Sequence, residues 1–289
     1  MNLSISNIAW GVKDDAELYS FLTAQNFQGI EIAPTRIFPV RPYDNLLDAA
    51  KFARQVDQRY GLRISSLQSI WYGRQENIFD SKESYDSLLR YSKQAVLFAE
   101  AMGCHNLVFG CPKSRNIPVG MEKDEAIKIA KSFFLEIGEF AKEHHSVWAL
   151  EANSVIYHTN FINTTSEAIE LVKMINHEGC KLNLDLGTVI YNSNLLYSQS
   201  DKDETVKLNE IKRVLQKAIP LANHIHISEP WLKPIRKRKL HDLLFEMCIQ
   251  LGYAHYISVE MGNNGSVEDV KKVIRYIRNK LVVNGWIEK

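Results

Sequence analysis

Residues 181–185 read KLNLD, and three other short stretches have the same form: VWALE at 147–151, NHIH at 223–226 and YISVE at 256–260. Each stretch is largely apolar, ends on a residue that can bind a metal ion, and is followed by a helical pattern. The four end residues are, in chain order, glutamate, aspartate, histidine and glutamate. In a closed barrel of parallel strands, the carboxyl ends of all strands open at one mouth, where such enzymes place their chemistry. We therefore expect the four side chains to converge there.

The alternation of strand and helix patterns extends through the whole chain. Strands are expected at Leu3–Ala9, Gly29–Ile32, Leu62–Gln68, Asn106–Gly110, Val147–Glu151, Lys181–Asp185, Asn223–His226 and Tyr256–Glu260. Helices are expected at Asp14–Ala24, Leu46–Tyr60, Ser84–Met102, Lys123–Glu143, Thr165–Ile175, Glu204–Ile219, Leu240–Leu251 and Val267–Val282. This count favours a (β/α)8 TIM barrel over a doubly wound sheet. No linker divides the chain, so we predict one α/β domain spanning residues 1–289.

Composition excludes several classes of function. The 35 basic and 34 acidic side chains nearly cancel, which argues against nucleic acid as a partner. No segment approaches the roughly 20 apolar residues that cross a bilayer, so no membrane partner is expected. The four scattered cysteines form no Cys-x-x-Cys pair and fit a reduced cytoplasm. A homo-oligomer is compatible with the sequence, which does not decide the oligomeric state.

The four end residues, Glu151, Asp185, His226 and Glu260, are the predicted metal ligands. Any one of them alone would more often be a helix cap or a structural residue, but their equivalent positions favour a shared site. Three carboxylates and one imidazole suit Mn²⁺ best, while Mg²⁺, Co²⁺ and Zn²⁺ also fit this donor set. Side chains two residues apart share a face of a strand, so His224 is expected beneath the metal, orienting its neighbours.

Five segments resemble signatures of the xylose-isomerase-like barrel superfamily, whose members are often called sugar phosphate isomerases/epimerases. The similarity covers essentially the whole chain and specifies the superfamily better than the substrate. The segments are Val108–Arg115, Ala149–Asn153, Leu182–Thr188, His224–Ile227 and Ser258–Glu260.

The resemblance implies a reaction. In the family's epimerases, two glutamates matching Glu151 and Glu260 bind the metal and also exchange protons with a substrate carbon, through a metal-stabilised enediolate. Two positions depart from the D-tagatose-type epimerases: Thr188 stands where they carry histidine, and Leu232 stands where they carry arginine. These departures put the epimerisation of free ketoses in doubt and leave the metal chemistry intact.

Residues that closely follow strand ends are candidates for binding a carbohydrate, because aromatic faces stack on sugars and amides bind hydroxyl groups. Arg115 is the favoured contact for an anionic group such as a phosphate, because arginine binds such groups with two parallel hydrogen bonds. The substrate-binding candidates are Trp10, Gln68, Arg115, Asn153, His158 and Lys233.

The leading hypothesis is a metal-dependent isomerase or epimerase of a sugar, sugar phosphate or related polyol. A dehydratase of a keto-inositol or similar keto-polyol is the main alternative. An endonuclease-IV-like DNA repair enzyme would need more histidine and aspartate ligands for its three metals. A non-catalytic sugar-binding barrel also remains open, because a fold does not fix a reaction.

Overall fold

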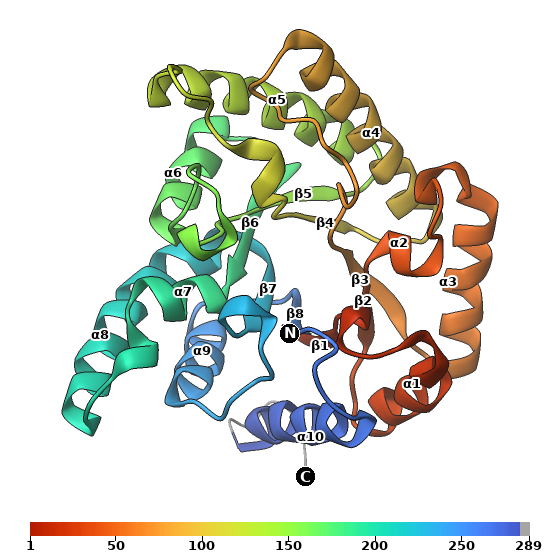
Figure 1. Ribbon diagram of the computed structural model, residues 1–289. Coiled ribbons are helices and arrows are strands. Elements are labelled where there is room, and N and C mark those ends of the chain that lie inside the picture. The colour runs from red at the N-terminus through yellow and green to blue at the C-terminus, as the bar shows by residue number, and fades with distance from the viewer. Residues whose placement is uncertain (284–289) are drawn as a thin grey trace.

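All eight predicted strands form, and every strand pair in the sheet is parallel, in a computed structural model that describes residues 1–283. The strands surround a common axis (Figure 1). Their bounds are β1 Asn2–Ile5, β2 Gly29–Ile32, β3 Arg63–Leu67, β4 Asn106–Phe109, β5 Val147–Glu151, β6 Cys180–Asp185, β7 Ala222–Ser228 and β8 Tyr256–Glu260. The order around the sheet is β1-β8-β7-β6-β5-β4-β3-β2, and contacts between β1 and β2 close it into a TIM barrel.

The first and the seventh strands differ from prediction. β1 ends at Ile5, because the next residues turn into a short 3-10 helix, Asn7–Ala9. β7 continues to Ser228, so His226 lies two residues inside its strand. The closure between β1 and β2 uses one bridge, Ser6 to Glu31, and a hydrogen bond from the Gln28 amide to the Leu3 carbonyl.

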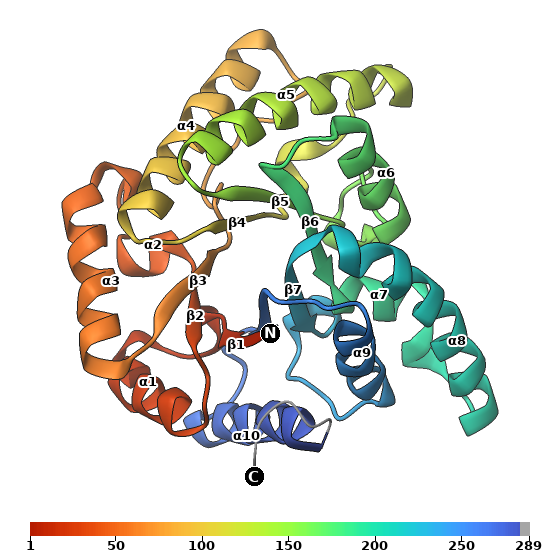
Figure 2. The ribbon, with the colours of Figure 1, turned by 180° about the vertical axis from the view of Figure 1, so that it is seen from behind.

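The helices cover the outside of the ring, and Figure 2 shows the same arrangement from behind. The eight predicted helices are present, and α10 packs beside α1 to complete the outer layer. α2 and α7 are additional short helices. The bounds are α1 Asp15–Ala24, α2 Pro34–Ile37, α3 Leu46–Tyr60, α4 Lys82–Ala101, α5 Lys123–Glu143, α6 Thr165–Ile175, α7 Leu186–Asn192, α8 Asp201–Ala218, α9 Lys239–Gln250 and α10 Val267–Val283.

Local sequence explains individual helix ends. At the start of α6, the Thr164 side chain accepts a hydrogen bond from the Glu167 amide, and the Glu167 carboxylate accepts one from the Thr164 amide. α3 ends at Gly61, whose φ of 67° is the left-handed conformation that glycine adopts without a steric cost.

The molecule has two interior regions of different composition, one between the strands and the helices and one inside the barrel. Between strands and helices the core is apolar; in one cluster, Trp71 packs on Phe109 and Trp148. Inside the barrel, by contrast, many buried side chains are small or polar, whereas most TIM barrels fill this space with branched apolar residues. They include Ser4, Ser65, Ser66, Asn106, Asn183, His224 and Ser258.

Candidate active site

The four predicted ligands lie together at the carboxyl ends of β5 to β8. Ligand atoms of Glu151, Asp185 and His226 all lie within 4.8 Å of one another. The fourth residue joins them, because Oε2 of Glu260 is 3.3 Å from Nδ1 of His226. The same nitrogen is 3.6 Å from Oε2 of Glu151. All four residues are buried. The sequence therefore identified a real cluster, whose role as a metal site is developed below.

Asp185 has two tasks in this arrangement. Its Oδ1 accepts a hydrogen bond of 2.6 Å from the Thr188 amide and so caps α7, while its Oδ2 accepts one from the Ser228 hydroxyl. Ser228 in turn accepts a hydrogen bond from the Gly187 amide. A Cβ at position 187 would lie only 2.9 Å from Ser228 Oγ, which explains why glycine follows the aspartate so closely.

Glu151 is held from three sides. Its Oε1 accepts a hydrogen bond from Asn153 Nδ2 at 3.0 Å, and its Oε2 accepts one from Asn183 Nδ2 at 3.1 Å. Arg115 fixes the backbone beneath: one guanidinium nitrogen donates to the Glu151 carbonyl at 2.8 Å and another to Asn153 Oδ1 at 2.7 Å. These contacts position the carboxylate before any ligand arrives.

The two glutamates of the cluster resist ionisation, because their pKa values are raised. Burial, and next the charge of Asp185, raise the pKa of Glu151 well above its usual range. Burial likewise raises the pKa of Glu260. Burial alone would lower the pKa of His226, but the charges of Glu31 and Glu260 raise it well above its usual value. The group therefore binds protons tightly when no metal cation balances its negative charge.

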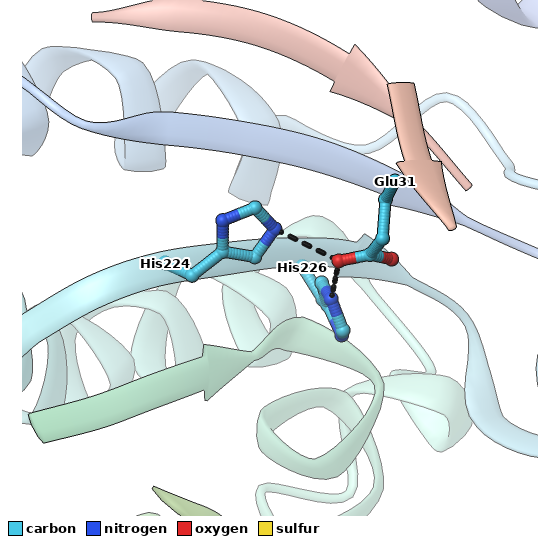
Figure 3. Close-up of side chains that lie close together, drawn as sticks. All are labelled: Glu31, His224 and His226. Atoms are coloured by element: carbon cyan, nitrogen blue, oxygen red, sulfur yellow. Dashed lines mark hydrogen bonds and ion pairs between the residues drawn. The ribbon is translucent and has the colours of Figure 1, made fainter. Parts of the chain in front are cut away.

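One member of the network was missed by the sequence analysis. Glu31, from β2 on the other side of the barrel, lies 3.0 Å from Nε2 of both His224 and His226 (Figure 3). Burial alone would raise the pKa of Glu31, but the charge of His226 and hydrogen bonds from both histidines hold it well below its usual range. The available signal was a lone carboxylate in the otherwise apolar strand GIEI, where a core strand would normally carry none.

The residues present fit a divalent cation. The cluster offers carboxylate oxygens and an imidazole nitrogen, a donor set that suits Mn²⁺, Mg²⁺, Co²⁺ or Zn²⁺. Each carboxylate oxygen keeps a lone pair beyond the hydrogen bond that it accepts. If ionised together, the three buried acidic groups would carry more negative charge than His226 can balance, and Asn183 Oδ1 is buried with no partner among the described residues.

A cavity of about 220 Å³ opens above the cluster and includes Glu151, Asp185 and Glu260 in its wall. At about 30 Å³ for each water molecule, it has room for roughly seven, which suits a small metabolite. Two predicted substrate contacts, Gln68 and Asn153, line it. The remaining lining residues are Ile8, Ser69, Val108, Gly110, Cys111, Pro112, Tyr157, Ser228 and Leu232.

The other four predicted substrate contacts are not among these lining residues. Trp10 is buried, and its indole nitrogen donates to Asp15. Arg115 is only 1% exposed and is held by the contacts described above. His158 is exposed, and Lys233 lies over the ring of Trp231, 4.9 Å from its centroid. Tyr157, the neighbour of His158, lines the cavity and was missed, as was Ser228.

The chain belongs to the xylose isomerase-like TIM barrel family, whose model matches residues 21–280. No curated protein matches the chain in sequence. Among the described residues, no helix is long and apolar enough to cross a membrane.

Three solved structures illustrate how widely this fold is shared. The 3-keto-D-glucoside 4-epimerase YcjR from E. coli has a TM-score of 0.72 at 15% identity, covering 96% of this chain and 99% of its own. The D-psicose 3-epimerase from Clostridium cellulolyticum H10 has a TM-score of 0.74 at 13% identity, covering 96% and 97%. The IolI protein, solved with a zinc atom, has a TM-score of 0.67 at 17% identity and covers both chains fully. At these identities the likeness shows the fold alone.

Proposed function

We propose that this chain is a divalent-metal-dependent isomerase or epimerase of an uncharged sugar or related polyol. The observation that carries the proposal is the convergence of Glu151, Asp185, His226 and Glu260 on the floor of a small cavity. Two structural neighbours named as sugar epimerases support the choice of reaction class.

The two glutamates are the proposed proton carriers. With Asp185 and His226 they would hold the ion, which when bound would polarise a substrate carbonyl and acidify the adjacent C–H bond. Glu151 and Glu260 come from β5 and β8, so their carboxylates approach the cavity from separate strands. A carboxylate that holds the ion through one oxygen can present its other oxygen to a C–H bond, where it could accept and return a proton. One glutamate would remove the proton and the other would replace it.

The wall of the cavity favours an uncharged substrate. Among the residues that the structure describes, its lining includes no lysine or arginine. A phosphate group would therefore lose its water without gaining a cationic partner. The lining instead offers amide and hydroxyl groups of Gln68, Asn153 and Ser69, beside apolar surface from Ile8 and Leu232. Such a mixture suits hydroxyl groups and C–H faces.

The test is a screen of uncharged ketoses, keto-sugars and keto-polyols, each beside its phosphate, in D₂O with Mn²⁺. We expect deuterium at one carbon of an uncharged substrate and its isomer, and no exchange by the Glu151→Gln, Glu260→Gln double variant. Loss of water from the product would make the enzyme a dehydratase. Preference for the phosphate would overturn the uncharged class, and absence of exchange with every compound would contradict proton transfer.

A further inference from the structure

Glu31 is a buried carboxylate that forms no ion pair with a lysine or arginine among the described residues. It is 0% exposed, and its ion pairs within residues 1–283 are both with histidines, His224 and His226. Removing a carboxylate from water is strongly unfavourable unless the carboxylate is closely paired. Its Oε2 lies 3.0 Å from a nitrogen of each ring, whereas its Oε1 has no partner in this part of the chain. One oxygen is therefore dedicated to two histidines.

The backbone places this oxygen firmly. The register of β2 against β3 shifts between Ile30 and Glu31, so that Glu31 pairs with Ser66. Such irregularities re-aim a side chain near functional sites. On the other side, Ser6 bridges to Glu31 where the barrel closes. Glu31 is thus held between two strands and reaches β7 across the barrel interior, as Figure 3 shows.

The two nitrogens of His226 face different groups. Nε2 lies 3.0 Å from Glu31, whereas Nδ1 lies 3.2 Å from Nδ2 of Asn183, 3.3 Å from Glu260 and 3.6 Å from Glu151, on the side of the proposed metal. A neutral imidazole carries a single N–H, and the partner of one nitrogen decides which nitrogen keeps its lone pair. An acceptor at Nε2 keeps the hydrogen there and leaves the lone pair of Nδ1 directed at the ligand cluster.

We infer that Glu31 is a positioning residue that fixes the tautomer and the ring orientation of His226, so that Nδ1 binds the metal. The inference rests on the metal centre of the proposed function. His224 lies on the other side of the carboxylate: its Nε2 is 3.0 Å from the same oxygen, and this close contact limits how far the carboxylate can move. Carboxylates that orient ligand histidines in this way typically contribute about 10–100-fold to metal affinity.

A second arrangement uses the same residues. Glu31, His224 and His226 offer ligand atoms within 4.8 Å of one another and could hold an ion of their own. That arrangement would make His226 bridge two metals and would require two ions in each chain. The short distances of 3.0 Å favour the positioning role, because the Glu31 oxygen already lies within hydrogen-bonding distance of both rings and is hydrogen-bonded to His226.

The experiment titrates Mn²⁺ into metal-free parent, Glu31→Ala and Glu31→Gln. Ser66→Ala is the matched control, because Ser66 is buried beside Glu31 and does not contact His226 in the described structure. We expect Glu31→Ala to weaken binding about 100-fold, and Glu31→Gln, which keeps an acceptor oxygen and the shape, about tenfold. Ser66→Ala should bind like the parent. Loading with Zn²⁺ and ¹⁵N-histidine NMR should show His226 with its hydrogen on Nε2 and the metal on Nδ1.

Each contrary outcome has a distinct meaning. If the parent binds one ion and both Glu31 variants match Ser66→Ala, the positioning role is wrong while the metal centre stands. Two ions in the parent, with one lost on Glu31→Ala, would make Glu31 a ligand instead. Coordination of Zn²⁺ through Nε2 of His226 would also overturn the inference. A parent that binds no metal would overturn the metal centre together with it.

Discussion

The floor and the rim of the cavity are built differently. The floor consists of strand residues, such as Glu151 and Asp185, that hydrogen bonds brace from neighbouring strands and loops. The rim consists of loop residues, and three of them, Ser69, Cys111 and Leu232, have φ values of 53°, 44° and 51°. Non-glycine residues in this region cost roughly 1–3 kcal/mol and concentrate at functional sites. The contrast is consistent with the proposed function, in which strand residues supply the chemistry and loop residues the specificity.

The two departures from the ketose-epimerase pattern, Thr188 and Leu232, lie in different parts of the site, one behind the floor and the other at the rim of the cavity. Thr188, in the first turn of α7, supports the floor from behind: its hydroxyl donates to the Ala152 carbonyl and its amide to Asp185. It braces Asp185, a predicted ligand, at the position where the D-tagatose-type epimerases carry a histidine. Leu232 belongs to the rim and gives the cavity an apolar wall where an arginine would give it a charge. The changed residues therefore leave the floor intact and alter what the rim can recognise.

The largest effect is expected on the floor. Glu151→Gln and Glu260→Gln should each lower kcat by about 10²–10⁴, because each removes a proton carrier but keeps a metal-binding oxygen. Rates of isomerisation and of solvent deuterium incorporation would be measured beside Mn²⁺ affinity, which should fall far less. Full activity in both variants would exclude these residues as bases.

The pH dependence of metal binding should be the next largest effect. Without metal, the raised pKa values of Glu151, Glu260 and His226 mean that these groups hold protons that the ion must displace. Mn²⁺ affinity should therefore rise with pH, by up to about tenfold per unit for each displaced proton, above the usual carboxylate range near pH 4.3. Calorimetric titrations at several pH values would measure it. A flat affinity between pH 5 and 8 would be inconsistent with the raised pKa values.

A substitution of Arg115 tests whether this residue supports the floor of the cavity, as its hydrogen bonds suggest, or binds the substrate, as the sequence predicted. Arg115→Lys cannot keep both the Glu151 carbonyl and Asn153 in place, because lysine lacks the planar fork. We expect kcat to fall roughly tenfold and by the same factor for charged and uncharged substrates. A selective rise in KM for a phosphorylated substrate would instead make Arg115 an anion contact.

The smallest effect is expected at the rim. Leu232→Ala should raise KM about fourfold for each methylene group that touches substrate, since a buried methylene contributes about 0.8 kcal/mol. The kcat and the Mn²⁺ affinity should be unchanged, because Leu232 takes no part in the hydrogen bonds described above that hold Glu151 and Asp185. Steady-state kinetics with the best uncharged substrate would show this. If Leu232→Ala lowers kcat more than Arg115→Lys does, the proposal that rim residues affect substrate binding and floor residues affect the chemistry is wrong.

Sequence patterns predicted the fold and the four-residue cluster because both follow from strand periodicity. A residue at the carboxyl end of a barrel strand lies at the mouth of the barrel, so its position follows from where the strand ends. Loop residues have no such constraint: Trp10 follows β1 as expected, yet it turns to Asp15, and His158 turns outward while Tyr157 faces the cavity. Glu31 was missed for another reason, since its partners are 193 and 195 residues away and nothing local indicates the pairing.

The ligand set itself is tested most directly by metal binding. Mn²⁺ would be measured by equilibrium dialysis with elemental analysis for the parent, Asp185→Ala and His226→Ala. Asp15→Asn, which alters a carboxylate on α1 away from the cavity, is the control. We predict one ion in each parent and control chain, and binding weakened by at least about 100-fold in the two ligand variants. If Asp185→Ala and His226→Ala bind Mn²⁺ as tightly as the parent, the proposed metal centre is wrong.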